Sequence, residues 1–370
     1  MKKRVAFVIH KLSGGGAERV VIRLLRRLDR EKFLPLLIVL EKKGVFLENL
    51  PGDVPILDCG RYAEGGRWGW LRNFVLHLRR ERPDAIVGFL WFVNGLAVVL
   101  RFLSGTPSRL VLSERSTVIG SGEGKLVELI RRAVIIFLYP AADRIVPNSR
   151  ALARQLVDRF GIPPRKVTVI PNPVDIEEIA AQGTEEADPG VGREALPVVA
   201  GMGRLSREKG FDLLIRAAAE IRSPFRMVLM GEGPEEKSLR DLAARLGVSD
   251  RVRFTGFLRN PYASLARAEV FVLPSRYEGF PNGLVEAMAL GLPCVATRCP
   301  TGPEEILTDG ADGLLVPVED PGALAAAIER LLGDPALRER LGRAARERVR
   351  AYDAPGIVRR FEALIEEVAS

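Results

Sequence analysis

Two glutamates in the second half of the chain have the type and spacing to act together on a ligand. In SRYEGFPNGLVEAMALGLPCVAT (275–297), Glu278 follows a predicted strand, and Glu286 lies in the first turns of the next predicted helix. Carboxylates accept hydrogen bonds from hydroxyl groups such as those of a sugar or a ribose. Glu286 alone could simply complement the helix dipole, worth about 0.3–1 kcal/mol, but this explanation does not cover Glu278.

The residues between the two glutamates are predicted to form the entrance to this site. Phe280, Pro281 and Asn282 would shape it, and the amides of Gly283 and Leu284 would lie near a helix N-terminus. Backbone N–H groups at such an end favour an anionic ligand. The segment therefore predicts a pocket for a molecule that carries both hydroxyl groups and negative charge.

Two cations occur in a second loop, GMGRLSREKGFDLLIRA (201–217). Arg204 can bind a diphosphate with its planar fork of donors, and Lys209 can act as a point charge. The simpler alternative is a solvated basic loop, and we interpret Arg207 and Glu208 in that way. The position between a predicted strand and a predicted helix favours the diphosphate for the first two residues.

Glycine-rich turns follow two other predicted strands. HKLSGGGAERV (10–20) places Gly15 and Gly16 before a helix, where backbone amides could approach a phosphate or an acceptor. Gly231 and Gly233, in a second glycine-rich turn, could lie close to a nucleotide, with Phe257 at the edge of a base pocket. For both turns, ordinary tight-turn geometry is the alternative. The spacing is not G-x-G-x-x-G, so NAD binding is disfavoured.

The elements that position these loops alternate between apolar strands and amphipathic helices, which predicts parallel sheets covered on both faces. The predicted strands of the first half are 4–10, 35–40, 54–58, 85–90, 109–114 and 144–149. Those of the second half are 196–205, 226–231, 252–257, 270–275, 293–298 and 313–318. The fold class is therefore α/β, with two doubly wound, Rossmann-like domains whose strand ends face one cleft.

The domain boundaries follow from prolines and from a polar stretch. We predict an N-terminal domain over 1–172, a linker or exposed loop over 173–195 and a C-terminal domain over 196–355. A final helix over 356–370 could pack back on the N-terminal domain. The first domain would carry the acceptor side and the second the nucleotide side.

Charge and cysteine content restrict the function classes. The chain has a net charge of +8, but residues 1–170 carry 30 Lys/Arg against 15 Asp/Glu, whereas the remainder is acidic. No zinc-finger, helix-turn-helix or RNA-binding signature accompanies the basic half, so a nucleic-acid partner is not expected. Three scattered cysteines and no signal-peptide pattern favour the cytoplasm.

Taken together, the motifs resemble family 4 of the retaining glycosyltransferases, which have the GT-B fold. The matching pieces are GGGAERV, PNPVDI (171–176), GRLSREKGFDLLIRA, GEGP, FTGF and the Glu-x7-Glu segment, in the family's order over nearly the whole chain. The opening and SRYEGFPN are most similar to bacterial members that build lipopolysaccharide, capsule or polyprenyl-linked glycans. The resemblance implies a nucleotide-sugar donor, UDP-linked, and a glycan or lipid-linked acceptor.

The resemblance also implies roles for individual residues. Arg204 and Lys209 would hold the donor diphosphate, Glu278 would meet the transferred sugar, and Glu286 would bind the ribose. Gly15 and Gly16 would lie beside the phosphate and the acceptor.

Many relatives have a cleft histidine that is absent at the corresponding position here. That position falls in SERS (113–116), so Glu114 and Arg115 are assigned to the acceptor or sugar side, together with His10 and Asn148. The other histidine, His77, is interpreted as structural.

The predicted chemistry needs neither a metal nor a resident cofactor. The chain has no Asp-x-Asp pair, and Arg204, Lys209 and a helix N-terminus would stabilise the departing nucleotide instead. Two alternatives stay open: a GT-B epimerase acting on the nucleotide sugar, and a non-catalytic sugar-binding protein. The first would need more cleft histidines, and the second would not need Glu278 or Arg204.

The basic N-terminal half further predicts peripheral contact with an anionic membrane. The cations that could take part are Arg23, Arg26, Arg27, Arg72, Arg79, Arg80, Arg131 and Arg132. The apolar run 133–139 could lie in the membrane interface, or it could be a core-facing helix segment. Trp68 and Trp70 could contact the acceptor or the membrane.

Overall fold

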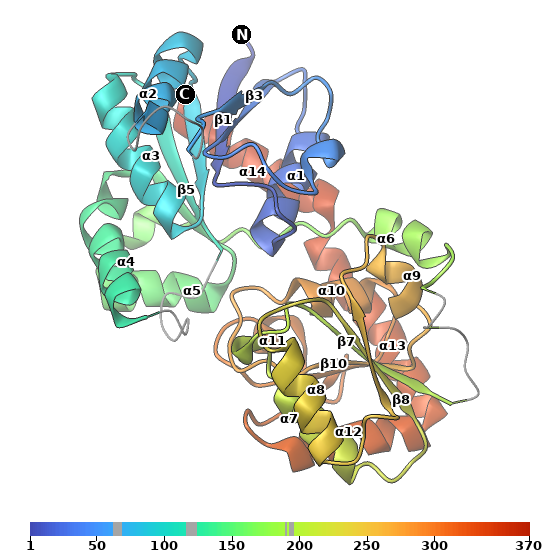
Figure 1. Ribbon diagram of the computed structural model, residues 1–370. Coiled ribbons are helices and arrows are strands. Elements are labelled where there is room, and N and C mark those ends of the chain that lie inside the picture. The colour runs from blue at the N-terminus through green and yellow to red at the C-terminus, as the bar shows by residue number, and fades with distance from the viewer. Residues whose placement is uncertain (62–68, 116–123, 189–190, 192–195) are drawn as a thin grey trace. The chain divides into compact units, whose positions relative to one another are not determined.

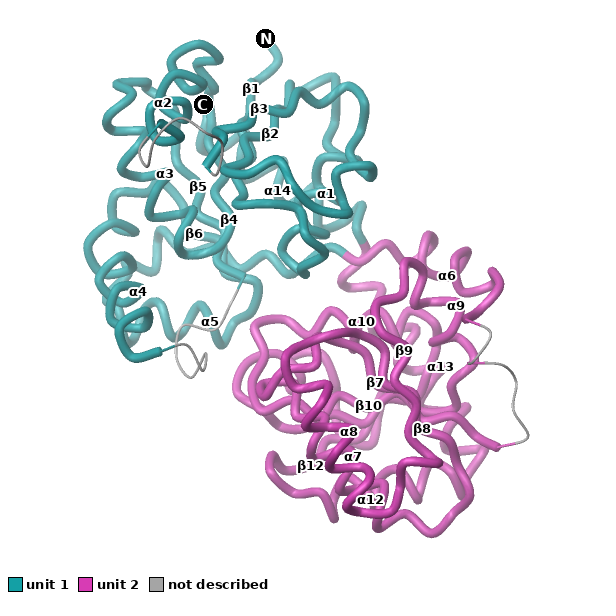
Figure 2. The backbone as a smooth tube through the Cα atoms, viewed as in Figure 1, with its two compact units in different colours: residues 1–173, 354–370 teal, residues 174–353 magenta. Residues whose placement is uncertain are grey.

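A computed structural model describes residues 1–61, 69–115, 124–188, 191 and 196–370 of the chain. The chain forms two compact units, which are coloured separately in Figure 2. Unit 1 comprises Met1–Pro173 and Ala354–Ser370, and unit 2 comprises Val174–Asp353. Each unit is built around its own parallel sheet and is described by itself.

The described part of unit 1 contains six parallel strands in the order β3-β2-β1-β4-β5-β6 (Figure 1). The strands are β1 (Lys3–Ile9), β2 (Phe33–Val39), β3 (Ile56–Asp58), β4 (Ala85–Phe89), β5 (Arg109–Glu114) and β6 (Arg144–Pro147). The helices are α1 (Gly16–Arg27), α2 (Gly69–Glu81), α3 (Trp91–Ser104), α4 (Lys125–Phe137), α5 (Arg150–Arg154) and α14 (Ala354–Ala369). A π-helical turn, Gln155–Arg159, continues α5.

The unit 1 sheet is buried on both faces, which explains its continuous apolar strands. Successive side chains of a strand point to opposite faces. Accordingly, Val5, Phe7 and Ile9 of β1 belong to a core with residues of α1 and α14, whereas Ala6 and Val8 belong to a second core with residues of α2, α3 and α4. An apolar residue is therefore required at nearly every position of the strand.

The described part of unit 2 also contains six parallel strands, in the order β12-β11-β10-β7-β8-β9. The strands are β7 (Val198–Met202), β8 (Arg226–Met230), β9 (Val252–Gly256), β10 (Val270–Leu273), β11 (Cys294–Thr297) and β12 (Leu314–Val316). The helices are α6 (Ile176–Gly183), α7 (Phe211–Glu220), α8 (Glu236–Arg245), α9 (Pro261–Leu265), α10 (Asn282–Ala289), α11 (Pro303–Ile306), α12 (Pro321–Gly333) and α13 (Pro335–Val349).

Both sheets follow one winding scheme. Numbered from the first strand of each unit, the order is 3-2-1-4-5-6 in both, the arrangement of a doubly wound nucleotide-binding fold. The predicted pair of Rossmann-like α/β domains is confirmed. In this order the first and fourth strands are neighbours, and the crevice for ligands lies at their carboxyl ends.

The interpretation of 173–195 as a linker or exposed loop is wrong for part of its length. Ile176–Gly183 forms α6, and Ile179 is buried in a core of unit 2. The acidic composition of the stretch concealed a short helix that packs on this core with Ile176 as well as Ile179 and contacts α9 and α10. The predicted loop also includes residues 189–190 and 192–195, which lie outside the described residues.

The C-terminal helix belongs to unit 1. α14 contacts α1, β4 and β5, and Phe361 and Ile365 are fully buried in the core that α1 shares. The chain therefore returns to its first unit after completing the second.

Candidate functional site

A lysine and a glutamate meet at the carboxyl edge of the unit 2 sheet. Lys209 lies in the loop after β7, and Glu278 lies in the loop after the neighbouring strand β10. The Lys209 Nζ atom is 2.7 Å from Oε1 and 2.9 Å from Oε2 of Glu278, and Ser275 Oγ donates to the same Oε1 at 2.7 Å. The side chains are 26% and 5% exposed, respectively, so the lysine is the accessible member of the pair.

The backbones of these two loops touch directly. Gly210, which ends the 3-10 turn Arg207–Lys209, has φ of +66°, and a Cβ there would lie 2.1 Å from the Pro274 carbonyl oxygen. Glycine is needed for both reasons, because other residues rarely adopt this φ and would clash. The amide of Arg276 also donates to the Glu208 carbonyl at 2.8 Å. Lys209 and Glu278 thus meet on loops that are tied together.

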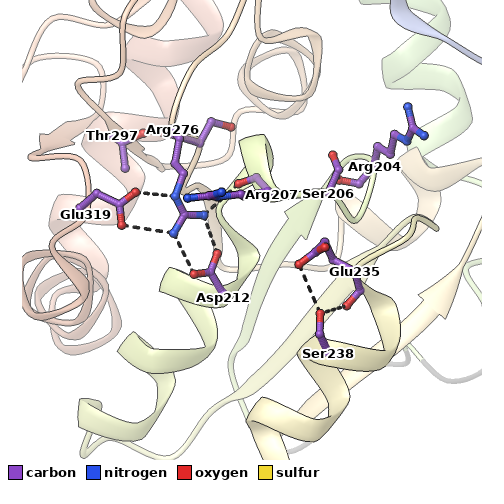
Figure 3. A network of polar contacts seen from close by, with 10 residues as sticks. Arg204, Ser206, Arg207, Asp212, Glu235, Ser238, Arg276, Thr297 and Glu319 are labelled. Atoms are coloured by element: carbon purple, nitrogen blue, oxygen red, sulfur yellow. Dashed lines mark hydrogen bonds and ion pairs between the residues drawn. The ribbon is translucent and has the colours of Figure 1, made fainter. Parts of the chain in front are cut away.

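Arg276 strengthens this tie with its side chain (Figure 3). Its guanidinium forms a fork with Asp212 of α7, with Nη1–Oδ1 at 2.6 Å and Nη2–Oδ2 at 2.8 Å, and it also binds Glu319 and the Arg207 carbonyl. Burial acts to raise the pKa of Asp212, but the hydrogen bonds and the charge of Arg276, with smaller contributions from its own backbone and from Arg216, together lower that pKa. Two carboxylates neutralise this arginine. Sequence reasoning missed the arrangement, because the partners lie 64 and 43 residues away.

Arg204 differs from the other cations of this edge. Its side chain is exposed and points away from the Arg276 network in Figure 3. Among the described residues, no hydrogen bond or ion pair engages its guanidinium. Of the two cations predicted to hold a diphosphate, Lys209 therefore has a carboxylate partner, and Arg204 is open to solvent.

The glycines of the turn after β8 are explained by close backbone packing. A Cβ on Gly231 would lie 2.0 Å from the Gly203 carbonyl oxygen, and one on Gly233 would lie 2.2 Å from that of Leu205. The turn therefore supports the loop that carries Arg204, and its predicted contact with a nucleotide stays a prediction. Phe257 is 44% exposed just after β9, which leaves its ring accessible at this edge.

The segment before and within α10, predicted to form the entrance to the site, is largely buried within unit 2. Phe280 is 8% exposed and packs edge-on against Tyr352, with ring centroids 5.6 Å apart, and Pro281 is buried beside it. Asn282 and Gly283, which begin α10, are half-buried, and Leu284 is fully buried. Phe280, Pro281 and Leu284 thus act first in packing.

Glu286 lies in the second turn of α10 and is 2% exposed. A carboxylate on the surface would suffice to complement a helix dipole, so this burial calls for a further explanation. Its predicted hydrogen bond to a ribose stays a prediction.

In unit 1, the glycine loop before α1 already binds a carboxylate. The amides of Gly14 and Gly15 donate to Glu18 Oε2 at 2.7 and 3.1 Å, and Gly16 begins the helix. Burial raises the pKa of Glu18, although these backbone hydrogen bonds act in the opposite direction. The donors predicted to face a phosphate thus have an internal anion as partner. The signal was present in the sequence as a glutamate in the first helical turn, three residues after Gly15.

Glu114 and Arg115 were assigned to the acceptor side, but both are buried within unit 1. Glu114 is fully buried at the end of β5, where it accepts a hydrogen bond from the Tyr139 hydroxyl and pairs with Arg131 at 3.6 Å. Arg115 donates from Nη1 to the Ile170 carbonyl at 3.1 Å and to Asn172 Oδ1 at 2.7 Å. Both side chains bind other segments of the unit, and their assignment to the acceptor or sugar side stays a prediction.

The other two residues assigned to the acceptor side also have partners within unit 1. Asn148, after β6, is 1% exposed and donates to the Arg115 carbonyl at 3.2 Å. His10, after β1, is half-buried, and its Nε2 lies 3.1 Å from Arg61 Nη1. Since a guanidinium only donates, Nε2 accepts and the proton lies on Nδ1. Burial, and then the charge of Arg61, lower the pKa of His10, which favours the neutral imidazole.

Two of the cations expected at the unit 1 surface are also buried. Arg23 is 9% exposed and donates to the Pro173 carbonyl at 2.9 Å, and Arg131 is 1% exposed in its pair with Glu114. Arg132, the next residue, is exposed. Trp70 packs against Arg61, whose guanidinium carbon is 5.2 Å from its ring centroid, while Trp68 lies outside the described residues.

In the described ranges, no three or more His, Cys, Asp or Glu side chains are grouped in a way that could hold a metal ion. None of the helices in these ranges combines the length and apolarity needed to cross a bilayer.

Comparison with known proteins identifies relatives of the whole chain. Residues 14–178 match the family model "Glycosyltransferase Family 4", and residues 184–348 match "Glycosyl transferases group 1". Over 366 residues the chain is 31% identical to N-acetylgalactosamine-N,N'-diacetylbacillosaminyl-diphospho-undecaprenol 4-alpha-N-acetylgalactosaminyltransferase of Campylobacter jejuni, covering 96% of this chain and 98% of that protein.

Two further similarities cover different extents. Over 182 residues the chain is 42% identical to the lipopolysaccharide core biosynthesis glycosyltransferase LpsD of Rhizobium meliloti. This alignment covers 48% of this chain and 52% of LpsD. Among solved structures, Anabaena Alr3699/HepE in complex with UDP and glucose superposes with a TM-score of 0.84 at 21% identity, covering 99% of this chain and 100% of that one.

Proposed function

Because the chain belongs to the family 4 glycosyltransferases, we propose that unit 2 binds a UDP-sugar and that the enzyme transfers the sugar, a hexose or N-acetylhexosamine, to a lipid-linked or other glycan acceptor. The observation that carries this proposal is the Lys209–Glu278 pair at the carboxyl edge of β7 and β10. Arg204, in the same loop as Lys209, is exposed to solvent. This combination offers cations to a diphosphate and a carboxylate to sugar hydroxyls.

The proposed division of labour follows from exposure and charge. Arg204 and Lys209 would stabilise the negative charge that develops on the departing nucleoside diphosphate. Glu278, held by Lys209 and Ser275, would accept hydrogen bonds from the sugar. The bond from the anomeric carbon to the diphosphate breaks, and the acceptor oxygen bonds to that carbon. The proton of the acceptor hydroxyl is transferred to the departing diphosphate. The acceptor attacks the face from which the diphosphate leaves, so the anomeric configuration is retained.

The donor and acceptor are proposed from the relatives. HepE was solved with UDP and glucose, and the C. jejuni relative is named for transfer of N-acetylgalactosamine to a diphospho-undecaprenol-linked sugar. Purified enzyme should be given UDP-glucose, UDP-GlcNAc and UDP-GalNAc with a polyprenyl-diphosphate-linked sugar, and the linkage read by NMR. Transfer from a UDP-sugar with an α-linked product supports the proposal. Absence of both transfer and donor hydrolysis across the panel would contradict it.

We also propose that no metal takes part, because two cations serve the diphosphate. Activity should survive EDTA. Loss of activity in chelator, with recovery on adding Mg²⁺ or Mn²⁺, would refute this part alone.

A membrane contact is proposed for unit 1, where the lipid-linked acceptor would be met. The large apolar side chains exposed on α3 and α4 are Val99, Phe102, Leu103, Leu126, Val127, Leu129, Ile130, Ile136 and Phe137. On α4, Leu126, Leu129, Ile130 and Phe137 follow helical spacing, so one stripe of this helix is apolar towards solvent. α3 and α4 contact each other, and Lys125 and Arg132 are exposed on the same helix.

This arrangement is typical of a helix that lies in a membrane interface. Within the apolar run 133–139, Ile135 and Tyr139 are fully buried, as in a core-facing helix segment. Ile136 and Phe137 are exposed, as a contact with the membrane interface would require. Each basic residue near an anionic surface adds about 1 kcal/mol to binding.

Liposome flotation tests the membrane contact. Wild type should float with anionic vesicles at low salt, and Leu129→Ser with Phe137→Ser should float less. Leu34→Ser changes an exposed apolar residue on β2, which is 44% exposed, outside α3 and α4, and should behave like wild type. Failure of wild type to bind anionic vesicles even at low salt would contradict the contact and favour a soluble acceptor.

A further inference from the structure

The polar network around Arg276 links the loop that carries Glu278 to the loop that carries Lys209. We infer that Arg276 is a positioning residue for glycosyl transfer: it holds the Glu278 loop against the Lys209 loop, so that both side chains face the donor at a set separation. This inference rests on the proposed function, since it concerns the same site, and it assigns a role to a residue outside the predicted site.

All five N–H donors of the Arg276 guanidinium have acceptors. Nη1 donates to Asp212 Oδ1 and to the Arg207 carbonyl at 2.6 and 2.8 Å, Nη2 donates to Asp212 Oδ2 and to Glu319 Oε2 at 2.8 and 3.2 Å, and Nε donates to Glu319 Oε1. Since no donor remains and two carboxylates surround a single cation, Arg276 is unsuited to bind a diphosphate. Its charge serves the protein internally.

The acceptors come from the segments that follow two other strands of the same sheet, the loop and first turn of α7 after β7 and the loop after β12. Arg207 and Asp212 flank Lys209 after β7, and Glu319 follows β12. Figure 3 shows the guanidinium between Asp212 and Glu319, with Arg207 at its side. Arg276 therefore joins three loops at the carboxyl edge, and two of them carry Lys209 and Glu278.

The Glu319 backbone supports this interpretation. Its φ is +60°, a left-handed conformation that is unusual for a residue other than glycine. Such strain persists only where surrounding contacts impose it. Glu319 binds the Arg276 guanidinium in this conformation, so the pair is a contact that holds the loop after β12.

Lysine cannot reproduce the fork, because its ammonium is a single point charge. Arg276→Lys should therefore keep the charge but loosen the junction. A displacement of about 1 Å can lower a rate 10²-fold, so we expect kcat to fall by about 10–100-fold, with a smaller change in the donor KM. Arg253→Lys is the control and should leave kcat unchanged. Arg253 forms an ion pair with Asp188, with an N–O distance of 3.0 Å, and neither residue belongs to these loops.

A double-mutant cycle separates positioning from a general loss of folding. If Arg276 acts through Glu278, Arg276→Lys should lower kcat in wild type but have little further effect in a Glu278→Gln background. An equal fold-loss in both backgrounds would overturn the inference. So would a lower melting temperature of Arg276→Lys with kcat unchanged.

A second cycle needs no turnover and stays informative if the proposed reaction is wrong. UDP affinity measured by calorimetry should fall in Arg276→Lys, and this fall should shrink in a Lys209→Ala background. Independent effects of the two substitutions on UDP affinity would contradict positioning of Lys209. If Arg276→Lys does not fold, Glu319→Gln, which retains the Asp212 fork, should show both couplings to a smaller extent, and its lack of either would count against the inference.

Discussion

In unit 1 the carboxylate at the end of the fifth strand, Glu114, is fully buried and pairs with Arg131, which is 1% exposed. In unit 2 the carboxylate after the fourth strand, Glu278, pairs with Lys209, which is 26% exposed. Arg204, in the same loop as Lys209, is exposed to solvent. The two sheets have the same strand order. Topology therefore determines where charged loops lie, and the elements packed over them decide whether the charges are available to a ligand.

The glycine loops after the first strand of each unit differ in the same way. In unit 1, the amides of Gly14 and Gly15 bind the internal carboxylate of Glu18. In unit 2, the loop after β7 presents cations rather than an internal anion.

The charges buried in unit 1 should matter for folding. Arg131→Met leaves the buried Glu114 carboxylate without the Arg131 cation, and breaking a buried pair in this way costs about 3–5 kcal/mol of unfolding free energy. Arg132→Met, the exposed neighbour, should cost no more than about 0.5 kcal/mol. Urea unfolding of both variants measures the difference. Similar losses at the two positions would show that the Glu114 network is not a structural pair.

The carboxylate of unit 2 should matter for turnover. Glu278→Gln keeps the size of the side chain and should leave the melting temperature nearly unchanged, while kcat falls by about 10²–10³. Steady-state kinetics and thermal melting on the same preparation separate the two effects. If the variant turned over at near the wild-type rate, Glu278 would not take part in the reaction.

The cations of unit 2 should matter for nucleotide binding. Removing Arg204 or Lys209 by substitution with alanine should weaken UDP binding by about 1.5–3 kcal/mol, the value of a charge-assisted hydrogen bond. Arg207→Ala is the matched control, because that side chain is exposed on the same loop. Isothermal calorimetry gives the affinities. Equal weakening by all three substitutions would indicate general electrostatic attraction rather than specific contacts.

The smallest effect concerns the pH dependence of unit 2 stability. Burial acts to raise the pKa of Asp212, but Arg276 lowers it below the ordinary value of 3.8. A carboxyl with a lowered folded-state pKa stabilises the fold above its unfolded pKa, and this stabilisation is lost as pH falls through the folded value. The difference in melting temperature between wild type and Asp212→Asn should therefore be largest near neutral pH and shrink below about pH 4. A constant difference across this range would exclude the Asp212 charge as its cause.

The strands and helices of both sheets could be predicted from the amino-acid sequence. Continuous apolar strands separated by amphipathic helices predict parallel sheets because this pattern is local and repeats with a fixed period. The same local logic located the loops of Arg204, Lys209 and Glu278, since ligand-binding residues follow the strands of such folds. It failed at Ile176–Gly183, where an acidic segment forms a helix that packs Ile176 and Ile179 on a core of unit 2.

The sequence did not show which charged residues face solvent and which form buried pairs, because both depend on tertiary packing. Arg131 and Arg132 are adjacent and identical in type, yet one is buried against Glu114 and the other is exposed, because a helix presents successive residues in different directions. Lys209 and Glu278 are 69 residues apart, and Arg276 binds partners from two other loops. Such pairs arise from strand order and packing across the sheet, and no sequence period encodes them.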